Sequence, residues 1–467
     1  MTKSASEKPA RSPTRPPRRG PKGAKPARPR QPREDGTPAR LAAMGVLRAV
    51  LETGSTLDDA LVKELGRPEL KNHPSDKALV RAIATIVLRR LGQIDDILAR
   101  MLDKPLTDKA PVATALLRIG VAELLFLGSA HHAAVNCAVT LAAGDKFARG
   151  FKGLINAVLR RVIREGDAIL KEQDAARLNL ADWAWASWSR AYGEETTRAM
   201  AEALLAEPPL DLTIKQDPQQ WAETLSGDLL PGGSVRLSHA GRIEELPGFK
   251  EGAWWVQDLA ASLPPRLLGN VEGEEVLDLC AAPGGKTLSL AARGAHVTAI
   301  DRAGGRLERL AENLKRTGLK ADIIKADLTT WAPNRKWSKI LLDAPCTATG
   351  TARRNPDVLY RKSEDEVTAL AKLQAELLTR AATWLAPGGT LVFCTCSLEP
   401  LEGPAQIGLF LSKNPRFERL PITADEIGDL SECLTPQGDL RTLPSHLGDR
   451  GGMDGFYAAR LIARAEP

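Results

Sequence analysis

Cysteine is scarce in this sequence, with six in 467 residues: Cys137, Cys280, Cys346, Cys394, Cys396 and Cys433. Their spacing follows no regular framework, and the first twenty residues contain no apolar segment of the kind that directs export. We therefore expect free thiols in the reducing cytoplasm, without disulfides. No run of eighteen apolar residues occurs either, so the sequence predicts no membrane-spanning helix.

Common zinc and nucleotide motifs are also missing. There is no CxxC pair and the six histidines are scattered, so we expect no metal site. No GxGxxG fingerprint of a dinucleotide site occurs. The stretch CAAPGGKT at 280–287 ends like a phosphate-binding GxxxxGK[ST] loop, but Cys280 replaces its first glycine. This loop is therefore not predicted to bind a diphosphate.

Positive charge is concentrated at the start of the chain. Residues 1–33 hold eleven Lys or Arg, one acidic residue and eight prolines, a net charge of +10. Because the whole chain has a net charge of +6, the remainder carries −4. The same segment contains almost no large apolar residues, so it cannot form a hydrophobic core. This composition predicts a disordered basic tail over 1–37. Such a tail is attracted to the phosphate backbone of nucleic acid.

A helical pattern follows over 38–169. ARLAAMGVLRAVLETG places Leu41, Met44, Leu47 and Leu51 on one face and ends at a glycine. Four further helical runs follow, of which 77–102 reads as one continuous run, and together they predict an all-α bundle. Five arginines of these runs face either RNA or plain solvent: Arg89, Arg90, Arg160, Arg161 and Arg164.

The rest of the chain divides into three parts. A helical connector is expected over 170–207, and a small α/β segment over 208–255 with strands at DLTIK, SVRLS and AWWVQD. Over 256–467 short apolar runs (EEVLDL, AHVTAI, ADIIKAD, SKILLDAP and TLVFCT) alternate with helical segments, notably 303–317 and 364–385. This alternation predicts a parallel, doubly wound, Rossmann-like sheet, in which ligands bind at the carboxyl ends of the strands.

Acidic residues stand at three of these strand ends. The first strand runs into the glycine loop at 280–287, and the next three end at Asp301, Asp327 and Asp343. Carboxylates in these places accept hydrogen bonds from ribose hydroxyls and from an adenine amino group. A nucleoside cofactor without a diphosphate fits this set, and S-adenosylmethionine is such a cofactor.

Two thiols stand at the ends of neighbouring strands. Cys346 follows the fourth strand in LLDAPCTATGTARRNPD, and Cys396 follows the fifth in LVFCTCS. Two thiols, Asp343 and a methyl donor suit methylation of cytosine at C5, where a thiolate adds to C6 and activates C5. The residues alone leave open which thiol attacks the base.

The motifs LDLCAAPGGKT, LLDAPCTATGTARRNPD and FCTCSLEPLE resemble the Sun (Fmu) family of RNA cytosine-5 methyltransferases. HAAVNCAVTLA and KGLINAVLRRV resemble a NusB-like RNA-binding domain, and the chain is most similar to the subgroup that methylates 16S ribosomal RNA. The resemblance implies a class I methyltransferase domain. It also implies that Cys396 is the nucleophile, that Cys346 releases the product and that Asp343 contacts the base. The implied donor site comprises Cys280, Ala281, Ala282, Pro283, Gly284, Gly285, Lys286, Asp301, Asp327 and Asp343.

The remaining expectations concern partners and alternatives. We expect 16S rRNA or a small-subunit assembly intermediate as the partner, and a monomer. Other RNA, such as tRNA, a DNA cytosine or amino-group methyltransferase, and a non-catalytic RNA-binding or antitermination factor are the alternatives. The sequence departs from the family pattern CSxxPEEN at Leu401 and Gly403 but retains Glu402. Cys137 and Cys394 are expected to fill the core, whereas Cys433 has no evident role.

Overall fold

The chain begins with a bundle of helices. The computed structural model describes residues 1–2, 36–106, 110–238 and 240–464, so nearly all of the predicted disordered tail lies outside the described residues. The helices of the bundle are α1 (Thr37–Thr53), α2 (Leu57–Leu65), α3 (Pro74–Arg89), α4 (Leu91–Met101), α5 (Pro111–Leu125), α6 (His131–Gly144) and α7 (Lys152–Glu172). The predicted all-α region is confirmed, and α7 continues three residues beyond 169.

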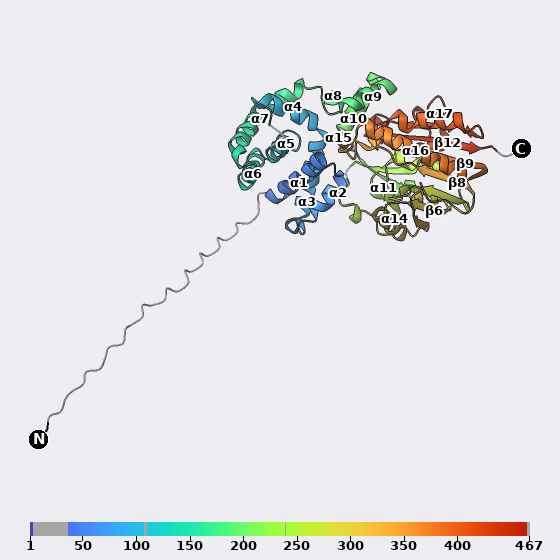
Figure 1. Ribbon diagram of the computed structural model, residues 1–467, viewed down its shortest axis with the longest axis horizontal. Helices are drawn as coiled ribbons and strands as arrows, with labels where there is room; N and C mark the ends of the chain where they lie inside the picture. The colour runs from blue at the N-terminus through green and yellow to red at the C-terminus, as the bar shows by residue number, and fades with distance from the viewer. Residues whose placement is uncertain (3–35, 107–109, 239, 465–467) are drawn as a thin grey trace. The chain divides into compact units, whose positions relative to one another are not determined.

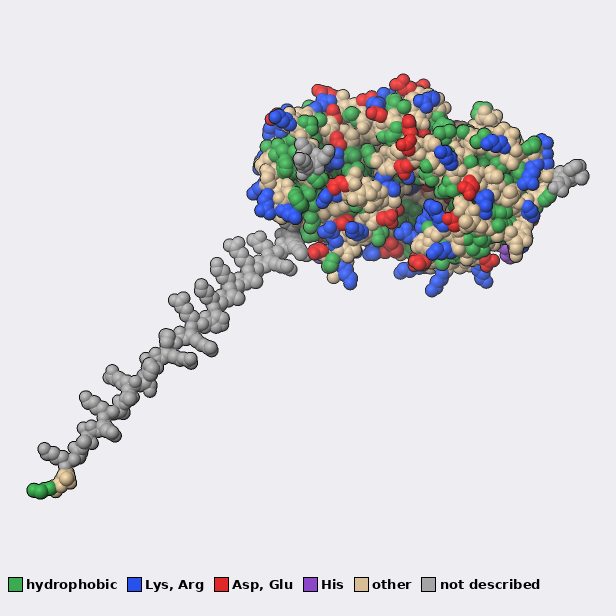
Figure 2. All heavy atoms as spheres, viewed as in Figure 1, with side chains coloured by type: hydrophobic (Ala, Val, Ile, Leu, Met, Phe, Trp, Pro, Cys, Tyr) green, Lys and Arg blue, Asp and Glu red, His purple; other side chains and the backbone are tan. Residues whose placement is uncertain are grey.

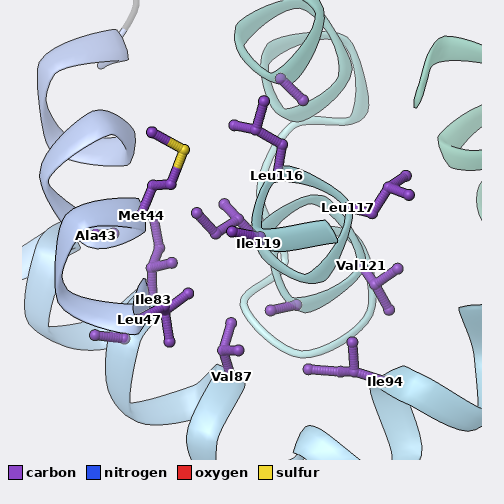
Figure 3. Close-up of a cluster of buried hydrophobic side chains, with 14 of the residues drawn as sticks. Ala43, Met44, Leu47, Ile83, Val87, Ile94, Leu116, Leu117, Ile119 and Val121 are labelled. Atoms are coloured by element: carbon purple, nitrogen blue, oxygen red, sulfur yellow. The ribbon is translucent and has the colours of Figure 1, made fainter. Parts of the chain in front are cut away.

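The core of the bundle lies between α1, α3 and α5, where Leu47, Ile83 and Ile119 are buried (Figure 3). As predicted, α1 ends at Gly54, whose left-handed backbone closes the last turn. The predicted apolar face is wrong at Leu41, which is 37% exposed, because small residues such as Ala43 face the core instead. The predicted run 77–102 is two helices, since the backbone leaves the helical region at Arg90 (φ −115°, ψ 18°).

Three shorter helices connect the bundle to the first sheet: α8 (Ala175–Leu178), α9 (Asp182–Tyr192) and α10 (Glu194–Leu204). The sheet has the order β2-β3-β1-β4, in which each pair is antiparallel. Its strands are β1 (Leu210–Ile214), β2 (Asp228–Leu229), β3 (Ser234–Leu237) and β4 (Trp254–Val256), and α11 (Pro218–Leu225) lies between the first two. The three predicted strands are confirmed, whereas the two-residue β2 was not predicted.

The second sheet has the order β10-β12-β9-β8-β5-β6-β7, with β11 pairing to β12. The strands from β9 to β7 run parallel to one another, whereas β10, β11 and β12 are antiparallel to their neighbours. The bounds are β5 (Glu275–Leu279), β6 (His296–Asp301), β7 (Asp322–Lys325), β8 (Trp337–Asp343), β9 (Leu385–Thr395), β10 (Phe417–Arg419), β11 (Leu440–Thr442) and β12 (Phe456–Ala463). The predicted parallel, doubly wound sheet is confirmed for the five strands from β9 to β7, whereas the antiparallel strands β10, β11 and β12 make the whole sheet mixed.

Helices cover both faces of this sheet (Figure 1). Leu378 of α16 (Glu364–Trp384) and Ile407 of α17 (Pro404–Lys413) pack on one face. The other face is covered by α12 (Leu259–Ser262), α13 (Gly285–Ala292) and α14 (Gly304–Thr317). A short helix, α15 (Val358–Arg361), precedes α16. Because apolar side chains of these helices cover both faces of the sheet, polar side chains are found at the ends of its strands.

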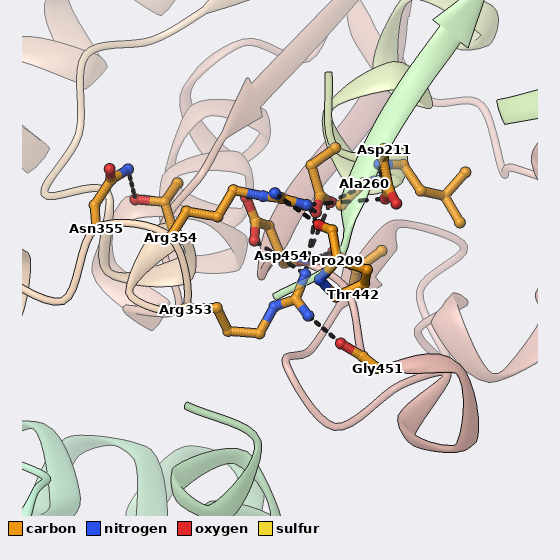
Figure 4. A network of polar contacts seen from close by, with 12 residues as sticks. Pro209, Asp211, Ala260, Arg353, Arg354, Asn355, Thr442, Gly451 and Asp454 are labelled. Carbon is orange, nitrogen blue, oxygen red and sulfur yellow. Dashed lines mark hydrogen bonds and ion pairs between the residues drawn. The ribbon is translucent and has the colours of Figure 1, made fainter. Parts of the chain in front are cut away.

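A buried network of charges connects the two sheets within the compact unit Gly36–Pro467. Arg354 lies 2.6 Å and Arg353 3.1 Å from the carboxylate of Asp258, and Arg353 also lies 3.4 Å from Asp454 (Figure 4). Asp211 of β1 accepts a hydrogen bond from the backbone of Leu259. The network therefore ties the segment after β8 to Asp258, directly before α12, and to Asp454, two residues before β12.

Candidate active site

The predicted site residues meet at one edge of the second sheet. Leu279 of β5 is in register with Ile300 of β6 and Leu342 of β8, and Asp343 is in register with Cys394 of β9. The carboxyl ends of these strands therefore lie side by side, as parallel pairing requires.

A cavity of about 340 Å³ opens at these strand ends. Its wall includes seven of the predicted site residues, Cys280, Ala282, Pro283, Asp301, Asp327, Asp343 and Cys346, and also the predicted nucleophile Cys396. The sequence patterns do not predict other residues of the wall, among them Arg302, Arg306, Leu328, Thr329, Leu373 and Leu377. The last two belong to α16, which no strand-end pattern places beside the cavity.

Asp301 holds the glycine loop in place. Its two carboxylate oxygens accept hydrogen bonds from the backbone of Ala282 (3.2 Å) and Ala303 (2.8 Å). Gly284 has φ +108°, and a Cβ there would lie 2.3 Å from Cδ1 of Leu310 in α14. Only glycine permits both this conformation and this close packing. The loop therefore turns tightly beneath the cavity and leaves room for a ligand.

Four of the predicted donor-site residues do not form the cavity wall: Ala281, Gly284, Gly285 and Lys286. Ala281 and Gly284 pack against their surroundings, whereas the Lys286 ammonium lies 2.7 Å from Oδ2 of Asp343. It also lies 4.7 Å from the centre of the Phe456 ring. These residues support the site from behind.

Asp343 is held from two sides. Lys286 donates to one oxygen, and the thiol of Cys394 donates to the other at 3.5 Å. Cys394 is fully buried, as expected of a core residue, but it also contacts this carboxylate. Burial alone would lower the pKa of Lys286, but the charge and hydrogen bond of Asp343 together with the nearby Cys394 and Cys396 outweigh it, so the pKa lies above its ordinary value. Lys286 is therefore a permanent cation at the bottom of the site.

The two thiols of Cys346 and Cys396 face each other with 3.5 Å between their sulfur atoms. The hydrogen bond to Cys396, burial and the nearby charge of Glu402 raise the pKa of the Cys346 thiol well above its ordinary value. Cys346 therefore keeps its proton at neutral pH. The backbone between them is also close, because Gly350 donates to the carbonyl of Cys396 at 3.0 Å. A Cβ on Gly350 would lie 1.9 Å from the carbonyl oxygen of Gly455, so only glycine fits there.

The remaining cysteines lie outside this pair. The Cys280 thiol lines the cavity, and burial raises its pKa above the ordinary value. Cys137 is buried in the helical region, as predicted. Cys433 is buried too, and its sulfur lies 3.2 Å from Nδ1 of His446, a contact that the sequence analysis did not foresee.

The arginines proposed to face RNA behave differently from one another. Arg89 is only 7% exposed and donates to the carbonyl of Arg353, so the prediction that it faces RNA or solvent is wrong. Arg90 is half-buried, whereas Arg160 and Arg164 are exposed. Figure 2 shows Lys and Arg side chains scattered over one face of the molecule, with Asp and Glu side chains between them.

Among the described residues, no group of three or more His, Cys, Asp or Glu side chains is arranged to hold a metal ion. Within those same residues, none of the helices has the length and apolar character needed to cross a membrane.

Comparison with known proteins decides the family. Residues 265–462 match the family "16S rRNA methyltransferase RsmB/F". The "Ribosomal RNA small subunit methyltransferase B" of Cronobacter sakazakii is 35% identical over 445 residues, which cover 91% of this chain and 98% of that protein. The chain belongs to the RsmB/F family. The RsmB/F protein of the same name from Pseudomonas syringae pv. tomato is also 35% identical, over 91% of this chain and 96% of its own.

Further matches support the two-part architecture of this RsmB/F member. Residues 37–164 match the NusB family, which confirms the predicted NusB-like domain. The crystal structure of PH0851 superposes with a TM-score of 0.72 at 22% identity, over 91% of this chain and 98% of that one, and shows a shared fold. As a member of a methyltransferase family, the protein uses S-adenosylmethionine as its donor, as predicted.

The cavity residues fit this donor. S-adenosylmethionine carries a ribose, an adenine and positive charge but no phosphate, and the wall offers three carboxylates and no phosphate-binding loop. Asp301 and Asp327 lie where ribose and adenine contacts are expected, and Leu328 adds an apolar side chain to the same wall. Methyl transfer would then take place beside Asp343 and the two thiols.

Proposed function

We propose that this RsmB/F member methylates C5 of a cytosine in 16S ribosomal RNA, with Cys396 as the nucleophile. The observation that carries the proposal is the pair of thiols, 3.5 Å apart on the wall of the donor cavity. C5 of cytosine is a weak nucleophile, and a thiol at C6 is the usual means of activating it. A single thiol would suffice for the attack, so a second one at this distance points to a separate task.

The proposed reaction begins at Cys396. Its thiolate forms a bond to C6, and the electron pair of the C5–C6 double bond becomes available at C5. C5 then bonds to the methyl group of the donor, and the sulfonium sulfur keeps the electron pair of the broken S–CH3 bond and leaves as S-adenosylhomocysteine. Loss of the proton from C5 and breakage of the S–C6 bond then restore the double bond and the thiolate. N3 of the ring takes up a proton from solvent as the thiolate adds to C6 and gives it back when the double bond is restored; the Asp343 carboxylate stabilises this N3–H group by accepting its hydrogen bond.

Cys346 is proposed to assist release. Because the pKa of its thiol is raised, Cys346 holds a proton 3.5 Å from the sulfur of Cys396. A proton donor in this position stabilises the Cys396 thiolate as it leaves C6. This division of tasks agrees with the roles that the family resemblance implies for the two positions.

Lys286 and the loop residues have supporting roles in this proposal. Lys286 orients Asp343, and Asp301 keeps the loop at Ala282 and Pro283 open for the donor. The target base must leave its stack to reach the thiols. We assign the flanking RNA to the NusB-like domain over 38–169 and the segment over 208–255, with 170–207 as connector, 256–467 as catalytic domain and 1–37 as a basic tail. A monomer working in the cytoplasm is part of the same proposal.

The test is methyl transfer from labelled donor to purified 16S rRNA and to small-subunit particles. The expected product is 5-methylcytosine, identified by mass spectrometry of the digested nucleosides. Label on N4 of cytosine, or no label from a protein that binds the donor, contradicts the proposal. Comparison of naked RNA with particles also shows which of them is the substrate.

A further inference from the structure

Glu402 is a fully buried carboxylate in the turn after β9. Oε1 accepts hydrogen bonds from the backbone of Thr347 at 2.9 Å and from Nε2 of Gln374 at 2.9 Å. Oε2 accepts from the hydroxyl of Ser397 at 2.6 Å and from the hydroxyl of Thr347. Four donors thus converge on a side chain that forms no part of the donor cavity wall.

These donors come from the two segments that carry the thiols. Thr347 directly follows Cys346, and Ser397 directly follows Cys396. Gln374 of α16 strengthens the link, because its Nε2 also donates to the carbonyl of Pro345, the residue before Cys346. One carboxylate therefore joins the ends of β8 and β9 immediately beside both sulfur atoms.

We propose that Glu402 is a positioning residue that fixes Cys346 and Cys396 at the separation needed to act on one base. The inference rests on the proposed function, in which one thiol attacks and the other releases. A free loop end samples several angstroms, and an error of about 1 Å in the placement of a reacting group can lower a rate by about 10²-fold. A four-donor carboxylate between the segments removes this freedom.

Glu402 also acts on Cys346 through its charge. It is one of the causes that raise the pKa of this thiol, after the hydrogen bond to Cys396 and burial. The same side chain therefore contributes both to the placement of the two sulfur atoms and to the raised pKa of the Cys346 thiol.

The hydrogen-bond pattern predicts which replacement Glu402 tolerates. The donors to Oε1 are N–H groups that cannot accept, whereas the two side-chain donors to Oε2 are hydroxyls that can reverse direction. The backbone N–H of Thr347 also lies 3.3 Å from Oε2, but its shorter contact is with Oε1. In Glu402→Gln the amide oxygen can take the Oε1 place and the NH2 group the Oε2 place, so four contacts persist. Glu402→Asp is one methylene shorter, and Glu402→Ala removes all four.

The test measures how fast Cys346 and Cys396 form a disulfide in the full chain, without RNA or donor. With oxidised glutathione as oxidant, the two thiols lose two protons and two electrons to form one S–S bond, while glutathione disulfide is reduced to two glutathione molecules. Mass spectrometry of the linked peptide, with fragmentation at Thr395, separates Cys396 from Cys394. Sulfur atoms 3.5 Å apart should link readily.

The Ala and Asp variants are expected to link about tenfold more slowly, and the Gln variant within about threefold of the wild type, since misplacement of this kind changes rates by one to two orders of magnitude. Single-turnover methyl transfer should fall in the same order while the dissociation constant of the donor stays unchanged. A folded Ala variant that links at the wild-type rate overturns the proposal, and so does a Gln variant as slow as Ala.

Two further variants keep the test decisive. If the Ala variant does not fold, Gln374→Met is used instead, because it removes only the hydrogen bonds that Gln374 donates to Glu402 and to the carbonyl of Pro345. Disulfide formation is then expected to be about threefold slower, and an unchanged rate overturns the proposal. Glu123→Gln is the matched control, because Glu123 is equally buried and accepts hydrogen bonds from Arg40 and Ser129 in the helical domain. It should link at the wild-type rate. Because disulfide formation needs no RNA, its rate can be measured even if the protein forms no 5-methylcytosine. Failure of this proposal and failure of the proposed function are therefore distinguishable.

Discussion

Replacing Lys286 by methionine removes the cation behind Asp343 while keeping an unbranched side chain only one atom shorter. The ammonium and the carboxylate are 2.7 Å apart, and their side chains are 10% and 28% exposed. Breaking a fully buried pair costs about 3–5 kcal/mol, and the partial exposure of Asp343 reduces this to about 2–3 kcal/mol. In a domain of this size, such a loss lowers Tm by about 5–10 °C.

The pH dependence of this loss has a defined sign. The pKa of Lys286 is raised in the folded protein, so its contribution is complete below the ordinary lysine value of about 10.4. It is lost only as pH rises through the higher folded value. The difference in unfolding free energy between wild type and Lys286→Met should therefore stay constant between pH 6 and pH 9.

The assay combines urea unfolding with single-turnover methyl transfer and donor-binding calorimetry. We expect transfer to fall about 10²-fold, because Asp343 loses its orientation, while donor affinity falls far less. Lys215→Met is the control, since Lys215 is half-buried and donates to the backbone carbonyl of Thr317 rather than to a carboxylate. A Lys286→Met protein with wild-type transfer, or with the same small stability loss as the control, would refute the reasoning.

Three other substitutions test separate parts of the account. Cys394→Ala should cost about 1–2 kcal/mol in urea unfolding yet keep methyl transfer within about threefold, because Lys286 still holds Asp343; a transfer-dead variant would contradict this. Asp301→Asn keeps one of two backbone contacts, so calorimetry should show donor affinity reduced about tenfold, and unchanged affinity would count against the donor site. Burial and the charge of Asp258 raise the pKa of Asp454 to about 7, so its ionisation destabilises the fold increasingly from pH 4 to pH 7. Asp454→Asn should therefore stabilise the protein by about 2–3 kcal/mol more at pH 8 than at pH 5, and an equal effect at both would exclude this explanation.

Much of the fold follows from local patterns in the sequence. Buried parallel strands are nearly continuous apolar runs, so β5, β6, β8 and β9 stand out between helical segments. The antiparallel strands β10 and β12 do not, because their pairing joins segments that are remote in sequence. Arg89 shows the same limit in the helical region, since a charged residue in a helical run gives no local sign that another domain will bury it.

The residues of the candidate site also fall into those that the sequence predicts and those that it does not. Strand order predicts that Asp301, Asp343, Cys346 and Cys396 meet, because every one of them follows a parallel strand. Residues that reach the site from elsewhere are not predicted, such as Leu373 on α16. In the sequence, Glu402 stands out only as a retained family position. Its contacts with both thiol segments depend on how two loops fold over each other, which no periodicity in the sequence encodes.

The central claim is that Cys396 attacks the base and Cys346 releases it. The most direct measurement incubates Cys346→Ala and Cys396→Ala, each with 16S rRNA and S-adenosylmethionine, and looks for a protein–RNA adduct that survives denaturation. The account predicts a stable adduct with Cys346→Ala, linked through Cys396, and none with Cys396→Ala. An adduct that accumulates with Cys396→Ala instead would reverse the assignment, and the absence of any adduct while Cys346→Ala still turns over would contradict the account.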